Sequence, residues 1–455
     1  MAMGRRSKAD QEALFLSALD LPRSPGHLFY ERLNRLLADS GFDEFAEQQC
    51  RRFYAEGVGR PSLPPGTYFR LQLIGYFEGI GSERGIAWRC ADSLALRTFL
   101  GFALDQHTPD HSTISKTRRL LDLETHEAVF AWVLERLADH GLVKGETVSV
   151  DATTLEADAA MRSIQRRDDG RSYREYLDHL AQASGVETPR HADRKRVDRK
   201  RKKTTSNEDW EHPHDPDARI TRLKDGRTRM GYKAEHAVDL DSGAVVAATV
   251  QPGDRGDTTS IYETMSEMSD QLARLERAGH AVKEDGLTEV VADKGYHKGE
   301  LLEDLAQLEV KSYIAEPKRR RRKWKGKEGQ QRATYANRRR LQTRRGRHRM
   351  RQRAELTERS FAHAFDTGGL RRVTVRGMEN VRKRAQLQVA GFNLGLLMRK
   401  LIGVGKPRCL QGVAQALSSS ARGAVSAAST HMATVGASLD AMLEWRSTWS
   451  ARCAA

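Results

Sequence analysis

Three acidic residues stand in settings that favour metal chemistry. Asp151 lies in the β-rich run ETVSVDATTLEA, Asp293 ends the run LTEVVAD, and Glu358 lies in the segment RAELTERSFAHAF. Carboxylate oxygens are the ligands that Mg²⁺ prefers, and a pair of such ions can activate water or a 3′-hydroxyl against a phosphodiester bond. Each acid alone carries little information, because an aspartate after a strand more often forms a turn. Together, with a very basic segment between the second and the third, they predict an enzyme that acts on nucleic acid.

The basic segment spans residues 318–353. It holds eighteen Lys and Arg against one Glu, a local net charge of +17, whereas the whole 455-residue chain carries +16. A charge run can be no more than a solvated face, but Trp324 and Tyr335 interrupt this one and could stack on bases. We expect its cations to contact phosphates, which adds affinity without base selectivity. The residues predicted to do so are Arg319, Arg320, Arg321, Arg322, Lys323, Arg338, Arg339 and Arg340.

The composition limits the class of protein. The strongly positive charge indicates a polyanionic partner. No apolar run approaches the roughly 20 residues needed to span a bilayer, and the N-terminal residues lack the pattern of a signal peptide. Four widely spaced cysteines form no C-x-x-C pair, which argues against a disulfide framework and a structural zinc site. We therefore expect a cytoplasmic protein that is associated with the nucleoid when it binds DNA.

Residues 1–143 are predicted to form an all-α N-terminal domain. Apolar residues recur there at helical spacing, and glycines stand where helices should end, at Gly41, Gly79 and Gly141. Asp110 is a good N-cap for a short polar helix that ends in Lys-Thr-Arg-Arg. This helix and the one before it fit a DNA-binding helix-turn-helix, and they fit equally an ordinary helical hairpin with a hydrated polar face.

Strand patterns begin at residue 144. ETVSVDAT alternates like a half-buried strand, a hairpin is expected across residues 241–243, and further strands then alternate with helices. The predicted fold class is α/β, with a mixed-sheet catalytic domain over residues 144–404. Its polar stretch at about 156–215 is predicted to be an insertion or a mobile linker. An Ala- and Ser-rich tail, 405–455, shows no chemistry of its own.

The third acid lies on a helix expected around residues 354–365. Phe361 and Phe365 follow Glu358 by three and seven residues, which predicts that the three side chains share one face and that the carboxylate turns toward the core. Glu355 lies near the same face and is the rival third ligand.

Two further groups of residues could contribute to a site. Four side chains in WEHPHDPDARI have the spacing of metal ligands, but the two prolines there favour a capped turn instead. These are His212, His214, Asp215 and Asp217. Lys294 and His297, close to Asp293, could reach a phosphate or could close the turn.

The segments around the three acids resemble those of bacterial insertion-sequence transposases of the DDE class, whose catalytic domain has a ribonuclease-H-like fold. The resemblance covers roughly residues 25–405 and includes VSVDATTLEADAAMRS, VVADKGYH, SYIAEPKRRRRKWKGK and ERSFAHAFDTGGLRRVTVRG in the expected order. It implies that Asp151, Asp293 and Glu358 are the metal-binding carboxylates and that the cofactor is Mg²⁺ or Mn²⁺, as two ions. It also implies that the helical region is the accessory domain of the family.

The chain departs from related transposases around the glutamate. These often carry an Arg four residues before it and a Lys seven residues after it, where this chain has Ala354 and Phe365. A nearby cation, Arg351, Arg371 or Arg372, could take over the contact with DNA.

The resemblance implies a DNA transposase that cleaves the ends of an insertion sequence and transfers the 3′-hydroxyl ends to target DNA. Its partner is double-stranded DNA, and a homodimer on DNA is a mechanistic expectation because two ends must be brought together. Two alternatives stay open. One is a sequence-specific DNA-binding repressor with a vestigial catalytic centre, and the other is a metal-dependent nuclease without strand transfer.

Overall fold

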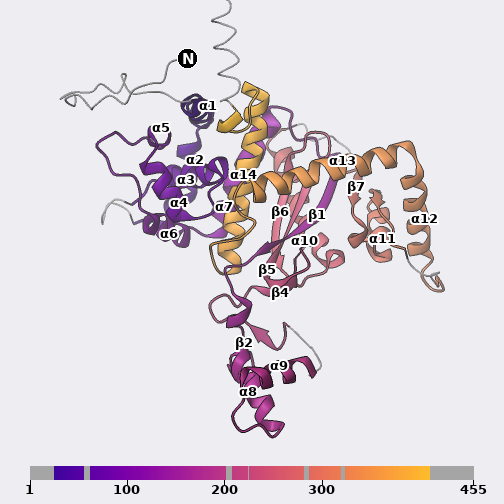
Figure 1. Cartoon of the computed structure of the whole chain (residues 1–455). Coiled ribbons are helices and arrows are strands. Elements are labelled where there is room, and N and C mark those ends of the chain that lie inside the picture. The colour runs from indigo at the N-terminus through magenta and orange to yellow at the C-terminus, as the bar shows by residue number, and fades with distance from the viewer. Residues whose placement is uncertain are drawn as a thin grey trace, which may run out of the picture. The chain divides into compact units, whose positions relative to one another are not determined.

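The structure is a computed structural model of the chain (Figure 1). It describes residues 25–55, 62–200, 207–223, 225–280, 286–318 and 323–409. Residues 33–405 form one compact unit, and the description of packing refers to this unit. Within the described residues, no helix is long and apolar enough to cross a membrane.

The N-terminal region is all-α, as predicted. Its helices are α1 (Pro25–Asp39), α2 (Phe42–Cys50), α3 (Pro65–Glu78), α4 (Glu83–Ala91), α5 (Leu94–Leu100), α6 (His111–Leu120) and α7 (Leu123–Asp139). Gly41, Gly79 and Gly141 have φ angles of 66°, 72° and 64°, a left-handed conformation that glycine adopts at low cost where a helix ends. Asp110 caps α6, because its carboxylate accepts a hydrogen bond of 2.7 Å from the backbone N–H of Ser112. The helix-turn-helix role of this region stays a prediction.

A six-stranded mixed sheet follows the helical region. Its strands are β1 (Thr147–Glu156), β4 (Arg219–Arg222), β5 (Thr228–Asp239), β6 (Val245–Pro252), β7 (Glu289–Ala292) and β8 (Lys311–Ile314). β5 pairs antiparallel with β1, β4 and β6, whereas β1, β7 and β8 are parallel neighbours. Helices α10 (Asp257–Arg277) and α11 (Gly299–Gln307) carry the chain to β7 and β8, as parallel pairing requires. The predicted α/β class and mixed sheet are confirmed.

The polar stretch between β1 and β5 is folded in its described part. It contains β2 (Gln165–Arg166), α8 (Tyr173–Ala183), α9 (His191–Lys200) and β3 (Trp210–Glu211), in addition to β4. Trp210 is buried, and its ring centroid lies 5.4 Å from that of Tyr173 and 5.3 Å from that of Tyr176. β2 pairs with β3, which brings the two ends of this insertion together. A small aromatic cluster therefore orders helices in a segment whose composition also fitted a mobile linker.

Helices cover both faces of the sheet (Figure 1). Successive side chains of a strand point to opposite faces. Lys233 and Glu235 of β5 contact α10 through the Ser260 hydroxyl, whereas Ser149 of β1 contacts Thr357 on the opposite face. The helices after β8 are α12 (Glu328–Gln342), α13 (Arg344–Phe361), which carries Thr357, and α14 (Met378–Ile402). α14 packs against α3, α7 and β6, so that it joins the helical region to the sheet.

Two buried histidines make this fold sensitive to acid. His126 of α7 lies 3.0 Å from the Tyr68 hydroxyl, and His236 of β5 lies 3.0 Å from the Ser360 hydroxyl. Burial lowers the pKa of both histidines to about 3. Below a pH of about 6.5 the unfolded chain binds a proton on each histidine and the folded chain does not, so the free energy of unfolding falls as the pH falls. At pH 5 we expect a loss of about 2 kcal/mol for each histidine.

Chemical denaturation at pH 7 and pH 5 measures this loss. His236→Gln should remove about half of the loss of unfolding free energy that the two histidines cause between pH 7 and pH 5. The control is His348→Gln, at an exposed position on α13, which should leave this loss unchanged. Equal pH dependence in the wild type and in His236→Gln would show that His236 takes up its proton in the folded state.

Candidate active site

The fold brings Asp151 and Asp293 to the same level of the sheet. β1 and β7 are parallel neighbours, and their last aligned pair is Val150 with Ala292. The next residue in each segment is the aspartate, and the backbone of Asp293 is still extended, with φ −75° and ψ 170°. Because side chains alternate along a strand, both carboxylates leave on the side opposite Val150 and Ala292. Two acids from distant parts of the sequence thus occupy neighbouring positions.

Helix α13 crosses β1 on the face that carries Asp151. Arg353 Nη2 donates a hydrogen bond to Asp151 Oδ2 at 2.7 Å, and the hydroxyls of Thr357 and Ser149 form a hydrogen bond. The side chains of Arg353 and Asp151 are only 11% and 21% exposed, so this ion pair is partly withdrawn from water and correspondingly stronger. The protein itself therefore supplies a positive charge at the first acid.

Glu358 does not point where the sequence argument placed it. Phe361 and Phe365 are buried, as expected, but Glu358 is exposed. Thr357 takes the inward position and contacts Ser149. One residue corresponds to about 100° around a helix, so Glu358 lies at the border of the face that contacts the sheet. The prediction that its carboxylate turns toward the core is wrong.

Two acids of the proposed metal site are thus placed side by side, and the third is not gathered with them. Among the residues that the structure describes, no three His, Cys, Asp or Glu side chains lie close enough to hold one metal ion. The oxygen donors of Asp151 and Asp293 fit a hard divalent cation such as Mg²⁺ or Mn²⁺. An acid from α13 would complete the set. Both Glu358 and Glu355 are exposed there, and Glu355 forms an ion pair of 2.5 Å with Arg359.

Arg353 is a site residue that the sequence argument did not single out. It stands among many arginines, and its only distinguishing feature in the sequence is its spacing of four residues before Thr357. Its contact with Asp151 joins residues 202 positions apart, which no local pattern reveals. The guanidinium that reaches the first acid thus stands one residue before Ala354.

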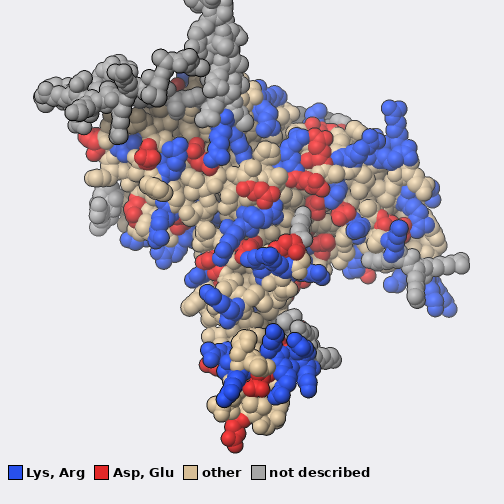
Figure 2. Space-filling model, viewed as in Figure 1, with Lys and Arg blue, Asp and Glu red and all other residues tan. Residues whose placement is uncertain are grey.

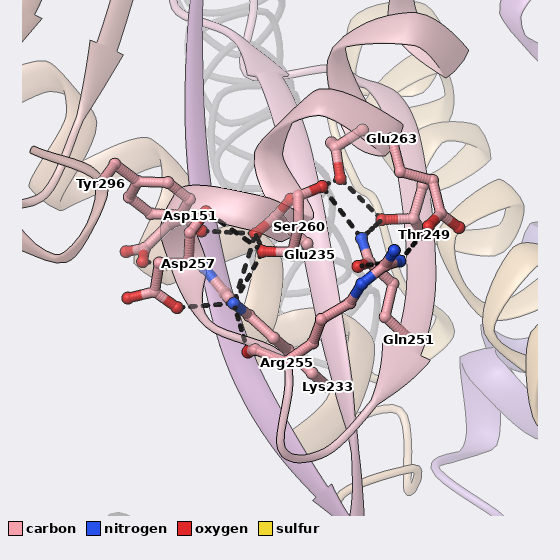
Figure 3. A network of polar contacts seen from close by, with 12 residues as sticks. Asp151, Lys233, Glu235, Thr249, Gln251, Arg255, Asp257, Ser260, Glu263 and Tyr296 are labelled. Carbon is pink, nitrogen blue, oxygen red and sulfur yellow. Dashed lines mark hydrogen bonds and ion pairs between the residues drawn. The ribbon is translucent and has the colours of Figure 1, made fainter. Parts of the chain in front are cut away.

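A buried polar network holds the turn that follows Asp293 (Figure 3). Glu235 of β5 is fully buried and accepts hydrogen bonds from the hydroxyls of Tyr296, Ser260 and Thr264 at 2.7, 2.8 and 2.5 Å. Burial raises the pKa of Glu235 above its ordinary value. Tyr296 belongs to the short 3-10 turn directly after Asp293, so its bond to Glu235 ties the second acid to the core.

Lys233 supplies the positive charge of this network. Its ammonium lies 2.6 Å from Asp257 Oδ1 and 3.8 Å from Glu235 Oε1, and the residue is only 6% exposed. A buried lysine is tolerated when such partners satisfy it. Of the two side chains near Asp293 that the sequence suggested, Lys294 is exposed and His297 is buried, so only Lys294 is accessible from solvent.

Some side chains of the basic segment, residues 318–353, contact other parts of the protein. Four of its predicted DNA-contacting residues, Arg319, Arg320, Arg321 and Arg322, lie outside the described residues. Lys323 and Arg339 are exposed. Arg338 forms an ion pair of 2.9 Å with Glu316, and Arg340 donates to a backbone carbonyl oxygen of β8 at 3.0 Å. Arg340 therefore holds α12 against β8, a role that its position in a run of basic residues does not predict.

Arg371 and Arg372 lie beside the end of β1. Arg371 Nη1 donates to Thr153 Oγ1 at 2.9 Å, and Thr153 is two residues beyond Asp151 on the same face. Arg372 pairs as an isolated bridge with Glu156, and its side chain is 65% exposed. Both predicted DNA-contacting residues therefore lie along the strand that carries the first acid.

The histidine- and aspartate-rich segment is a capped turn, as expected. Asp215 is buried and accepts hydrogen bonds from the Tyr232 hydroxyl at 2.5 Å and from the Gly377 N–H at 3.1 Å. Asp217 accepts from the Met378 N–H at 2.8 Å. These aspartates hold the end of the insertion against the start of α14.

Two family models match the chain. The model described as Transposase domain (DUF772) matches residues 18–120, and the model described as Transposase DDE domain matches residues 144–394. The second match covers more than half of the chain and includes β1, β7 and α13 with the three acids. Comparisons with curated proteins and with solved structures return no match. The chain therefore belongs to the DDE transposases of the insertion-sequence type, a family that acts in transposition.

Proposed function

We propose that the protein is a metal-dependent DNA transposase that cleaves the ends of its insertion sequence and joins the freed 3′-hydroxyl ends to target DNA. The neighbouring placement of Asp151 and Asp293 on β1 and β7, in a chain of this family, supports the proposal most directly. Glu358 is the third carboxylate of the proposed site.

The three carboxylates would hold Mg²⁺ or Mn²⁺, two ions in this proposal, which activate the attacking hydroxyl and stabilise the leaving 3′-oxygen. Side chains of the protein position and neutralise these carboxylates. Arg353 offsets the charge of Asp151 through their 2.7 Å ion pair, which lowers the cost of placing two acids together. Tyr296, bonded to Glu235, fixes the turn after Asp293. No covalent link between protein and DNA is required, in contrast to serine or tyrosine nucleophiles.

Double-stranded DNA is the proposed partner, both as element ends and as target. The exposed cations Lys323, Arg339 and Arg372 would contact phosphates without selecting a sequence. Because two ends must be cut and joined together, we propose a homodimer on DNA. A cytoplasmic location, close to the nucleoid, follows from the same proposal.

A joining assay tests the function. The purified protein is mixed with Mg²⁺, a target plasmid and a donor plasmid that carries the short inverted repeats flanking the reading frame. We expect cleavage at the repeat ends and joined products bounded by small direct duplications, and EDTA should suppress both. Cleavage without joined products would indicate the nuclease, and binding without cleavage would indicate the repressor.

A pair of matched variants identifies the third acid. Glu358→Gln should lower the cleavage rate at least about a hundredfold, because a metal ligand supplies several kcal/mol of transition-state stabilisation. Glu355→Gln should leave the rate within about twofold, because Glu355 is engaged by Arg359. Both changes remove one exposed charge from α13, so each controls the other for charge and folding. The reverse pattern of rates would assign the role to Glu355.

A further inference from the structure

A groove beside the end of β1 gathers arginines from distant parts of the chain. Its lining includes Arg162 from the insertion, Arg227 and Arg229 at the start of β5, and Arg372. Glu156, the last residue of β1, is the one acid in this lining. The groove has a volume of about 550 Å³. Separate loops and strands thus converge to place four guanidinium groups around one open space.

The charges in the groove are not balanced. Glu156 Oε1 lies 2.5 Å from Arg229 Nη1 and 3.9 Å from Arg372 Nε, so the only carboxylate of the lining is shared between two arginines. Outside the lining, Asp225 Oδ2 lies 3.9 Å from Arg227 Nε. Arg162 and Arg227 are exposed. Four guanidinium groups thus face two carboxylates, an excess of two positive charges, and an anion that enters the groove is attracted by this excess. Guanidinium groups match phosphate oxygens in geometry as well as in charge.

The groove lies along the strand that carries Asp151. Glu156 follows Asp151 by five residues, which along an extended strand corresponds to about 17 Å, and because five is an odd number its side chain leaves β1 on the side opposite that of Asp151. A DNA strand rises about 3.4 Å per nucleotide, so this distance matches about five base pairs. Figure 2 shows Lys and Arg side chains gathered at the level where the insertion joins the sheet. The spacing therefore suits a duplex that runs from the acids to the end of β1, where Glu156 and the groove lie.

We propose that this groove binds the DNA backbone about five base pairs from the bond that is cut beside Asp151 and Asp293. The position of that bond rests on the proposed function, but binding in the groove requires no cleavage. DNA is favoured over a free phosphate because the groove is open and its exposed arginines, Arg162 and Arg227, come from two separate segments, which suits a continuous chain of phosphates. Arg162 makes the insertion one wall of the DNA path.

A double variant and a matched control test the groove. Arg162→Ala/Arg227→Ala removes two exposed arginines from the groove, and Arg274→Ala/Arg277→Ala removes two exposed arginines from α10. Binding of the full-length proteins to an element-end duplex is measured in EDTA at several salt concentrations. The groove variant should bind at least about tenfold more weakly, and its slope of log K against log salt should fall by about 1.8, or 0.9 for each lost phosphate contact. The control should retain the wild-type slope.

Glu156→Gln should act in the opposite direction. It removes the one negative charge of the lining and keeps the size of the side chain, so DNA binding should become about threefold tighter or more. The proposal would be overturned if the groove variant and the α10 control showed the same slope of log K against log salt. Weaker DNA binding by Glu156→Gln than by the wild type would also overturn it.

Single uncharged methylphosphonates along the duplex test the position. A substitution about five base pairs from the cut bond should weaken binding by the wild type and leave the groove variant unaffected. An effect confined to the cut bond would contradict the assigned position. Failure of the proposed function is a different result: the wild type would then bind with a groove-dependent slope and release no cut product in Mg²⁺.

Discussion

Asp293→Asn is expected to lower DNA cleavage in Mg²⁺ at least about a thousandfold and to leave DNA binding in EDTA unchanged. The amide keeps the shape of the side chain but loses the negative charge that a hard cation requires. A thousandfold loss corresponds to about 4 kcal/mol of transition-state stabilisation, which is in the range that a metal site supplies. Cleavage of an element-end duplex and binding of the same duplex measure the two properties separately.

Asp151→Asn should reduce cleavage as strongly, with an added effect on stability. It leaves Arg353 partly buried without its counter-charge, so thermal unfolding should shift to lower temperature. Asp293→Asn keeps that ion pair and therefore separates the loss of catalysis from the loss of stability. Asp270→Asn, at an exposed position on α10, is the control for both. Cleavage at the wild-type rate by Asp293→Asn would remove this residue from the site.

Lys233→Met is expected to lower the free energy of unfolding by about 3–5 kcal/mol at pH 7. The change removes the ammonium that lies between Asp257 and Glu235 and leaves Glu235 in a fully buried position. Burial already raises the pKa of Glu235, so below the raised pKa the carboxyl binds a proton and needs no counter-charge. The deficit of the variant should therefore shrink as the pH falls. Chemical denaturation at several pH values measures both effects.

Lys298→Met provides the comparison. Lys298 is half exposed and pairs with Glu300 at 2.5 Å, and surface pairs of this kind contribute at most about 1 kcal/mol. Similar losses in Lys233→Met and Lys298→Met would mean that the network around Glu235 contributes little to stability. Tyr296→Phe, which removes only the hydroxyl bonded to Glu235, should cost about 1 kcal/mol.

The sheet and the helical region could be predicted because their signals are local. Val148 and Val150 alternate with polar residues over one strand, and the turn across residues 241–243 separates two apolar runs. Each pattern fits within about ten residues and reflects the geometry of a single element. The placement of Asp151 in a strand and of Asp293 after one followed from the same patterns, whereas the pairing of β1 with β7 joins residues about 140 positions apart and appears only in the structure.

The orientation of α13 could not be predicted in this way. Its buried residues include Thr357 and Ser360 beside Phe361, so hydroxyl groups form much of the face that packs on the sheet. Hydrophobic periodicity detects apolar residues only, and it therefore assigned the inward position to Glu358 instead of Thr357. The partners that select this face lie on β1, more than 200 residues earlier in the chain.

The DNA contacts of the basic residues could not be predicted from local sequence either. A dense run such as 318–353 is obvious in the sequence, yet Arg340 is engaged with β8. Arg162 and Arg227 stand in unremarkable segments and still converge in one groove. Local charge density predicts attraction to DNA, but only the tertiary structure determines which cations face solvent together.

The short ladder between β2 and β3 fastens the insertion at its base. Gln165 pairs with Glu211, and Arg166 pairs with Trp210, so residues 167–209 leave and return at one point. The entropy of closing such a segment changes slowly with its length, and β1 and β5 would keep their register if residues were added or removed beyond the ladder. Differences in length among related transposases should therefore accumulate there. A fluorescent or affinity tag inserted near Gly185, a left-handed glycine after α8 with φ 90°, should likewise leave the sheet intact.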